Sequence, residues 1–272
     1  KCIKSGKITM NYEYNTHVIK KMNMPFTITF VKREFFDSEK EVYKEIVTEI
    51  ENYLDAIERK FSIFKTDSIV SRHNELLNNF NEEFLDEEYQ EVFVRCQQAK
   101  TRTNGYFDAF FSGEYNPTGF VKGWAIEKAF FNYLEPLIKY GIVEAVAING
   151  AGDMQLGTKE GSDFIWNVGI ENPDNNQEII AKYSLQNGAI ATSGFSKKGE
   201  HIKSKNDIDN IQVTVVGEYL SDIDVFATTG IAMPGKEWNN FVIENRLMGI
   251  LVNKENKIIA FEGGKINEIK RS

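Results

Sequence analysis

The spacing of apolar residues predicts several helices in the first half of the chain and mainly strands in the second. Residues 26–30 (Phe-Thr-Ile-Thr-Phe) alternate apolar and polar side chains, which is typical of a half-buried strand. Ser38 and Glu41 form the S-x-x-E signature of a helix start, and apolar residues follow at helical spacing. These apolar positions are Val42, Ile46, Ile50, Leu54 and Ile57.

Three more helices are expected, over residues 86–100, 121–140 and 222–233. Pro136 would kink or end the second of these helices, and Gly141 would stop it. The inward positions of the helix over 86–100 would be Tyr89, Val92, Phe93, Cys96 and Ala99.

Residues 61–74 have the pattern of a loop with a short turn. Short apolar runs predict further strands, which are bounded by turn residues. The expected strands cover residues 142–148, 166–170, 179–185, 212–216, 249–252 and 258–261.

The order of these elements favours an α+β domain over a regular βαβ array. The chain has no internal repeat, low-complexity tract or linker rich in Pro, Gly and Ser, so we expect one compact domain over residues 24–272. Residues 1–23 are polar with weak periodicity, and we expect them to form an N-terminal arm or an edge strand.

Composition excludes several classes of protein. The 272 residues carry a net charge of −8, which is unsuited to sequence-independent binding of nucleic acid. Two cysteines, Cys2 and Cys96, form neither a disulfide framework nor a Cys-rich zinc site. No apolar run approaches the ~20 residues of a membrane span, and no secretory signal is present. We therefore expect a cytoplasmic protein, and Cys2 leaves a lipid-anchored, extracytoplasmic form as the alternative.

Five short segments combine glycine with polar side chains in a way that suits ligand contact. Residues 103–108 (Thr-Asn-Gly-Tyr-Phe-Asp) are the first, for which a helix end with a capping Asp is the alternative interpretation. Residues 116–123 (Asn-Pro-Thr-Gly-Phe-Val-Lys-Gly) lead into a helix, where free N–H groups and Lys122 would suit phosphate. An ordinary helix entry is the alternative there.

The third segment follows the strand expected over 142–148, and the fourth is itself a run of mostly small residues. Residues 149–153 (Asn-Gly-Ala-Gly-Asp) lack the last glycine of the dinucleotide-binding pattern, because Gln155 stands there. We therefore reject that fold and expect a tight turn capped by Asp153. Residues 189–194 (Ala-Ile-Ala-Thr-Ser-Gly) would suit a pyrophosphate, and His201 beyond them is either catalytic or an ordinary surface histidine.

The fifth segment, residues 222–230, places Asp224 and Thr228 four residues apart on one face of a predicted helix. A carboxylate, a hydroxyl and nearby carbonyl groups are the hard oxygen ligands that Mg²⁺ prefers. A capped helix with polar groups facing solvent is the alternative.

Taken in order, these segments resemble the motifs of the ApbE family, whose members are FAD:protein FMN transferases. The resemblance spans residues 24–233 and implies a single T-fold-like flavin transferase domain with an antiparallel sheet core and packed helices. It also implies FAD in a central cleft and Mg²⁺ at its pyrophosphate. The matching pieces are Met24, SIFKTDSIVSRHN (62–74), TNGYFD, NPTGFVKGWAIEKA, INGAGD, IATSG with His201, and DVFATT.

The resemblance also implies residue roles. Asp224 and Thr228, with the carbonyl groups of Gly119 and Ala227, would hold the metal, and His201 would be the base that takes the proton of an acceptor threonine. The FAD contacts would be Met24, Phe64, Tyr106, Phe107, Asp108, Asn116 and Lys122.

The implied activity is Mg²⁺-dependent transfer of FMN from FAD to a threonine hydroxyl of an acceptor protein, with release of AMP. Three positions depart from the family pattern: Lys203-Ser204 replace Asp-Pro after His201-Ile202, Asn116 replaces an acidic residue, and Ala151 replaces a glycine. Hydrolysis of FAD to FMN and AMP, or FAD binding without catalysis, are the alternative functions.

Overall fold

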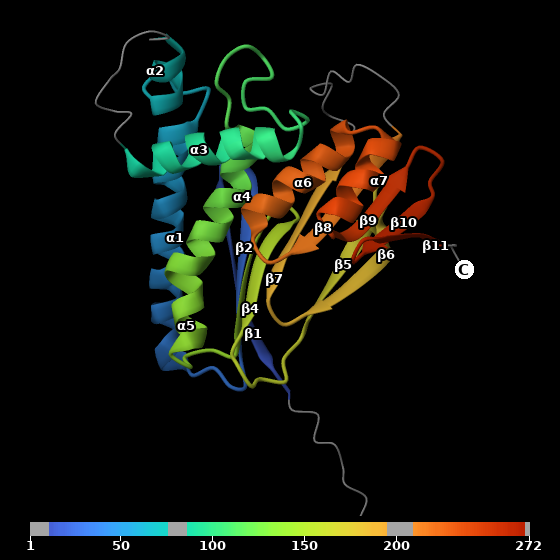
Figure 1. Ribbon diagram of the computed structural model, residues 1–272. Helices are drawn as coiled ribbons and strands as arrows, with labels where there is room; N and C mark the ends of the chain where they lie inside the picture. The colour runs from blue at the N-terminus through green and yellow to red at the C-terminus, as the bar shows by residue number, and fades with distance from the viewer. Residues whose placement is uncertain (1–10, 76–85, 195–208, 270–272) are drawn as a thin grey trace, which may run out of the picture.

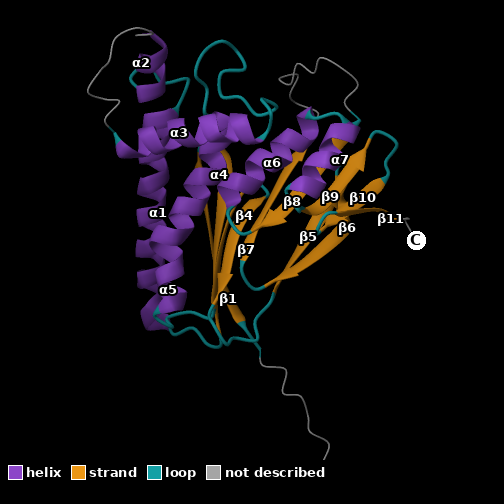
Figure 2. Cartoon of the chain, viewed as in Figure 1, coloured by secondary structure: helices purple, strands orange, loops and turns teal. Residues whose placement is uncertain are grey.

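The computed structural model describes residues 11–75, 86–194 and 209–269. Its centre is a nine-stranded sheet in the order β1-β2-β3-β4-β7-β8-β9-β10-β11, in which neighbouring strands are antiparallel (Figures 1 and 2). The strands are β1 (Glu13–Lys21), β2 (Met24–Lys32), β3 (Ala145–Gly150), β4 (Asp153–Thr158), β7 (Gly188–Gly194), β8 (Asn210–Gly217), β9 (Met248–Asn253), β10 (Ile258–Glu262) and β11 (Lys265–Ile269).

Helices pack on one face of this sheet and enclose the main hydrophobic core (Figure 2). That core contains Ile28 and Val215 from the sheet and Leu54 and Trp124 from the helices, all fully buried. The helices are α1 (Lys40–Phe61), α2 (Ile69–Glu75), α3 (Glu87–Arg102), α4 (Thr118–Ala129), α5 (Glu135–Lys139), α6 (Leu220–Ala232) and α7 (Gly235–Glu244). The α+β architecture with an antiparallel sheet is therefore confirmed.

A two-stranded ribbon covers part of the opposite face. Strands β5 (Trp166–Asn172) and β6 (Asn175–Leu185) pair only with each other among the described strands. Ile170 of the ribbon packs with Ile190 and Val216 of the main sheet in a second, smaller core. The sheet is thus apolar on both faces here, which explains why its strands carry few polar residues.

The first helix begins differently from the prediction. A short 3-10 turn (Asp37–Glu39) precedes α1, and Glu39 Oε2 accepts a hydrogen bond from the Phe36 N–H at 3.1 Å. The expected cap by Ser38 is therefore wrong. The buried face begins at Tyr43 and Val47, one position later than the predicted Val42 and Ile46, and Val42 is 48% exposed.

Other boundaries also differ from expectation. Residues 61–74 were predicted as a loop but contain most of α2. The helix expected over 121–140 begins earlier, at Thr118, and is interrupted by a π-helical turn (Phe130–Leu134) before α5. Pro136 lies in the first turn of α5, where its missing N–H breaks no hydrogen bond. Gly141 adopts φ 69° after this helix, as expected of a stop.

The segment before residue 24 contributes the edge strand β1. It pairs along its length with β2 through a turn in which Met22 and Asn23 have positive φ. Lys21 Nζ lies 2.8 Å from Asp55 and 3.1 Å from Glu51, so the hairpin is tied to α1. An arm was the other expectation for this segment, and the structure has a strand.

No helix in the described part of the chain combines the length and the apolar character needed to span a bilayer.

Candidate functional site

The contact between α4 and α6 brings together the polar segments that the sequence singled out (Figure 1). The two helices run antiparallel, since Gly123 meets Asp224 while Glu127, one turn later, meets Ser221, three residues earlier. If this register continues by one turn the other way, Gly119 of α4 and Thr228 of α6 are the next pair of positions along the contact. Residues from two distant segments therefore share one line of contact.

Gly123 permits the close approach. A Cβ atom at this position would lie 2.8 Å from Asp224 Oδ2 and 3.0 Å from the Asp224 Cβ. Any larger residue would push the two helices apart or displace the carboxylate.

Asp224 is a buried carboxylate with an unused oxygen. Its exposed fraction is 3%, and its Oδ2 accepts no hydrogen bond from the described residues. The pKa of Asp224 is raised to about 7: burial is the largest cause, the Lys122 ammonium opposes it, and the Asp153 carboxylate adds to it. A buried oxygen without a partner is costly, and such atoms concentrate where a ligand binds.

Lys122 supplies the cationic side of the site. Its Nζ forms an ion pair with Asp153 Oδ2 and lies 3.9 Å from Asp224 Oδ2. Burial lowers the pKa of Lys122, but the Asp224 and Asp153 carboxylates outweigh that effect and leave the pKa raised. The side chain thus stays protonated, with 30% of it exposed.

Asp153 is a site residue whose role the sequence analysis missed. The turn over 149–153 exists, with Ala151 and Gly152 at positive φ, but Asn149 Oδ1 accepts the Gly152 N–H. Capping by Asp153 is therefore wrong. This residue begins β4 with its side chain on the helix-covered face, where it is 1% exposed and beside Lys122.

Strand β7 contributes backbone and hydroxyl groups to the same place. The Thr192 N–H donates to Asp153 Oδ1 at 2.9 Å. Ser193 Oγ lies 3.2 Å from Thr228 Oγ1, which joins the A-T-S-G segment to α6. Three predicted segments, over 116–123, 189–194 and 222–230, therefore meet around Lys122, Asp153 and Asp224.

The expected metal ligands lie along this contact. Asp224, Ala227 and Thr228 are on α6, and Gly119 is in the first turn of α4. The carbonyl groups of Gly119 and Ala227 lie within helices, where each keeps a second lone pair beyond the helical hydrogen bond. Across the described ranges no three His, Cys, Asp or Glu residues cluster in a metal-binding arrangement. One carboxylate, hydroxyl groups and carbonyl groups remain as the donor set.

Three of the expected FAD contacts, Phe107, Asp108 and Asn116, come from the loop before α4. Asn116 Oδ1 accepts from the Thr118 N–H at 3.2 Å and so caps the first turn. Phe107 is 6% exposed and packs next to Gly119: its Cε2 would lie 3.6 Å from a Cβ atom added at that glycine. Asp108 accepts from the Phe110 N–H and pairs with Lys100 at 2.8 Å.

Three other expected FAD contacts differ in exposure. Phe64 is 85% exposed, so its ring is free to meet a ligand. Tyr106 is partly buried and donates its hydroxyl to Glu237 at 2.9 Å. Met24 packs against the main core at the start of β2. His201 lies outside the described residues.

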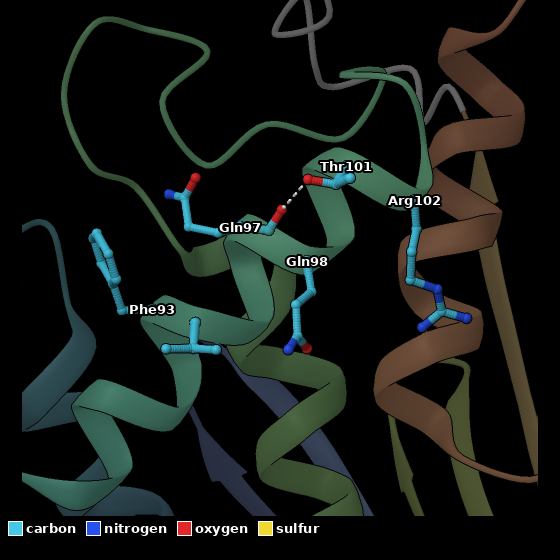
Figure 3. Close-up of a pocket in the computed structure, with 6 residues that line it drawn as sticks. Phe93, Gln97, Gln98, Thr101 and Arg102 are labelled. Atoms are coloured by element: carbon cyan, nitrogen blue, oxygen red, sulfur yellow. Dashed lines mark hydrogen bonds between the residues drawn. The ribbon is translucent and has the colours of Figure 1, made fainter.

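Two surface hollows flank this region. One, of about 480 Å³, is lined by Asn116 together with polar residues of α2 and the loop before α4, among them Asn74 and Glu114. The other, of about 440 Å³, lies along α3 beside Gln97, Gln98 and Arg102 (Figure 3). The second contains none of the expected site residues, and we assign it no part in the chemistry.

Comparison with known proteins shows the family and the fold of this chain. The sequence pattern of the ApbE family matches residues 22–116 and 114–251. This chain belongs to the ApbE family. Direct comparison with curated protein sequences gives no match.

Solved structures share the fold at low identity. The ApbE protein of Thermotoga maritima is 18% identical with a TM-score of 0.72, over 92% of this chain and 97% of that one. The flavin transferase ApbE of Vibrio cholerae is 14% identical with a TM-score of 0.67, over 95% and 97%. The flavinyl transferase ApbE of Pseudomonas stutzeri, in its apo form, is 14% identical with a TM-score of 0.69, over 95% and 96%.

Proposed function

We propose that this protein transfers FMN from FAD to a threonine of an acceptor protein, with the help of Mg²⁺ and with release of AMP. Two findings support flavin transfer in general: membership of the ApbE family, and the fold shared with structures named flavin transferases. The metal, the threonine and the release of AMP are our finer proposals.

The observation that carries the proposal is the unpartnered Oδ2 of Asp224, which is buried beside Lys122. Thr228 follows Asp224 by one turn of α6, and its Oγ1 lies 3.2 Å from Ser193 Oγ. We assign Mg²⁺ to Asp224, Thr228 and the carbonyl groups of Gly119 and Ala227, because hard oxygen donors suit this ion. When bound there, Mg²⁺ would neutralise charge on the pyrophosphate and make AMP a better leaving group.

The remaining groups of the site suit an anionic substrate. The ammonium group of Lys122 would bind phosphate oxygens. The ring of Phe64, which is 85% exposed, would contact FAD, as would Tyr106, Asp108 and Asn116. Met24 and Phe107 would complete the pocket from the core side.

The proposed transfer is a nucleophilic substitution at phosphorus. The threonine oxygen forms a bond to the phosphorus of the FMN half, and the bond from that phosphorus to the bridging oxygen breaks. AMP leaves with the bridging oxygen, and a base takes the hydroxyl proton. We propose His201 as this base, on the resemblance alone, since its ordinary pKa suits neutral pH.

Release of AMP tests the proposal. Purified protein, FAD and MgCl₂ are mixed with and without a threonine-containing acceptor protein, and AMP is measured by chromatography. AMP that requires the acceptor, together with covalent flavin fluorescence on the acceptor, supports transfer. AMP without the acceptor would instead mean hydrolysis, and FAD retained without any AMP would mean a flavin-binding protein.

Asp224→Asn separates the metal proposal from the fold. This variant keeps the size of the side chain but removes its charge, so AMP release should fall by more than about tenfold while the circular dichroism spectrum is unchanged. Chelation of the wild type with EDTA should have the same effect. Full activity in either case would rule out the metal assignment.

A further inference from the structure

Helix α6 begins without a side-chain cap of its own. Its N-cap residue, Tyr219, accepts no hydrogen bond through its side chain within the described chain. The Ser221 N–H donates instead to Glu127 Oε2 of α4 at 2.8 Å, and Ser221 Oγ donates to the same oxygen at 2.5 Å. Glu127 of the neighbouring helix therefore caps the Ser221 N–H, while Gln155 Oε1 of β4 accepts from the Leu220 N–H at 3.1 Å.

Glu127 suits this role electrostatically. It is 6% exposed, so its charge must be matched by partners inside the protein. The positive end of the α6 dipole supplies one, and Arg95 of α3 supplies another, with Nη1 3.6 Å from Glu127 Oε1. Arg95 Nη2 also donates to Ser221 Oγ at 2.7 Å, so Glu127, Ser221 and Arg95 each contact the other two.

This cap is adjacent to the candidate metal site on the same line of contact. Along α4, Glu127 follows Gly123 by one turn, and along α6, Ser221 precedes Asp224 by nearly one turn. A shift of α6 along α4 would move Asp224 and Thr228 away from the carbonyl group of Gly119. The hydrogen bonds between Glu127 and Ser221 oppose that shift.

We propose that Glu127 is a positioning residue for the metal site: by holding Ser221, it fixes α6 in register against α4 and so places Asp224 and Thr228. This inference rests on the proposed function, because it concerns the same cation. It adds a residue that lies outside the ligand set. Glu127 belongs to the NPTGFVKGWAIEKA segment, but no role was predicted for it from the sequence.

Binding of Mn²⁺ provides a test that does not depend on turnover. MnCl₂ is titrated into the protein with saturating FAD, and free Mn²⁺ is followed by electron paramagnetic resonance. Glu127→Ala should weaken Mn²⁺ binding on the order of tenfold, as expected when a group that orients ligands is lost. Glu127→Gln should lose less, because its amide oxygen still accepts from the Ser221 N–H.

Glu91→Ala is the matched control. Glu91 accepts from Trp124 Nε1 at 3.0 Å and pairs with Lys128 at 2.9 Å, with a longer contact of 3.9 Å to Arg95 Nη1. It thus joins α3 to α4, and among the described residues it has no hydrogen bond or ion pair to α6. Its loss should lower the melting temperature yet leave Mn²⁺ affinity unchanged. Ser221→Ala, which removes one of the two bonds, should weaken Mn²⁺ binding if Glu127→Ala does not fold.

The outcomes separate the two proposals. Failure of the wild type to bind Mn²⁺ would overturn the proposed metal site itself, and the positioning role with it. Tight binding by the wild type that Glu127→Ala or Ser221→Ala leaves unchanged would overturn only the role of Glu127. An equal loss of affinity in Glu91→Ala would also overturn it, since general destabilisation would then explain the effect.

Discussion

Lys122 places its ammonium group against the carboxylate of Asp153, a residue only 1% exposed at the start of β4. This ion pair joins α4 to the sheet directly below the candidate site. Breaking a buried pair from one side leaves an uncompensated charge, whereas removing both partners does not.

Lys122→Met should therefore destabilise the protein by about 3 kcal/mol, at the low end for buried pairs because 30% of the lysine side chain is exposed. The double variant with Asp153→Asn should recover part of this loss. Urea unfolding of the two single variants and the double variant measures the coupling. Additive losses would show that the pair contributes no coupling energy.

Gly123→Ala should disturb the site more than the fold. The added carbon would lie 2.8 Å from Asp224 Oδ2, so the carboxylate or the helix must move. We expect Mg²⁺-dependent AMP release to fall by at least about tenfold. Gly235→Ala is the control, because a Cβ there meets no atom within 4 Å, and its activity should match the wild type. A fully active Gly123→Ala protein would contradict the close contact.

Phe64→Ala should weaken FAD binding without lowering stability. Its ring is 85% exposed, so little core packing is lost and the free energy of unfolding should change by less than about 0.5 kcal/mol. Titration of flavin fluorescence measures the affinity. Phe111→Ala, which removes another aromatic ring that is 65% exposed and has no expected FAD contact, should bind FAD as the wild type does.

The Cys96 thiol should be unreactive in the folded protein. Burial raises the pKa of Cys96 to about 12, although Tyr115 and Arg95 lower it in part. Since the thiolate is the reactive form, a Cys2→Ser variant should release almost no chromophore from DTNB at pH 8, and one equivalent after unfolding in guanidinium. Rapid reaction of the native variant would show that Cys96 is open to solvent.

The same shift has a consequence for stability at high pH. The folded thiol keeps its proton, whereas the unfolded thiol loses it near pH 8.5. The contribution of Cys96 to stability is therefore fully present below that pH and declines as the pH rises toward 12. Cys96→Ala should flatten this part of the curve of unfolding free energy against pH.

Much of the fold was predictable because the spacing of apolar residues indicates which side chains are buried. The helix over 86–100 was placed within two residues, since Asp86 caps it by accepting from the Tyr89 N–H. Strands β4, β7 and β11 were missed. The first follows a glycine turn with little alternation, the second consists mainly of small residues, and the third is polar. Helix α7 was missed for a different reason: Pro234 and Gly235 at its start resemble a loop.

The candidate site was predictable in its pieces but not in its arrangement. Asp224 and Thr228 share a helix face by spacing alone, and the structure adds Ser193 beside Thr228. Neither Asp153 as the partner of Lys122 nor Glu127 as the cap of α6 follows from local sequence, since each contact joins residues far apart in the chain. A resemblance to a family names ligands, whereas such supporting contacts require the folded chain.

The π-helical turn over Phe130–Leu134 directly follows the stretch of α4 that contacts α6. A residue inserted into an α-helix rotates everything beyond it by about 100°, so an insertion between Gly119 and Glu127 would turn one half of the contact away. A π-helical turn accommodates one extra residue within a single turn. A residue added after Glu127 would thus leave the contact with α6 in place, whereas one added between Gly119 and Glu127 would turn part of the contact away.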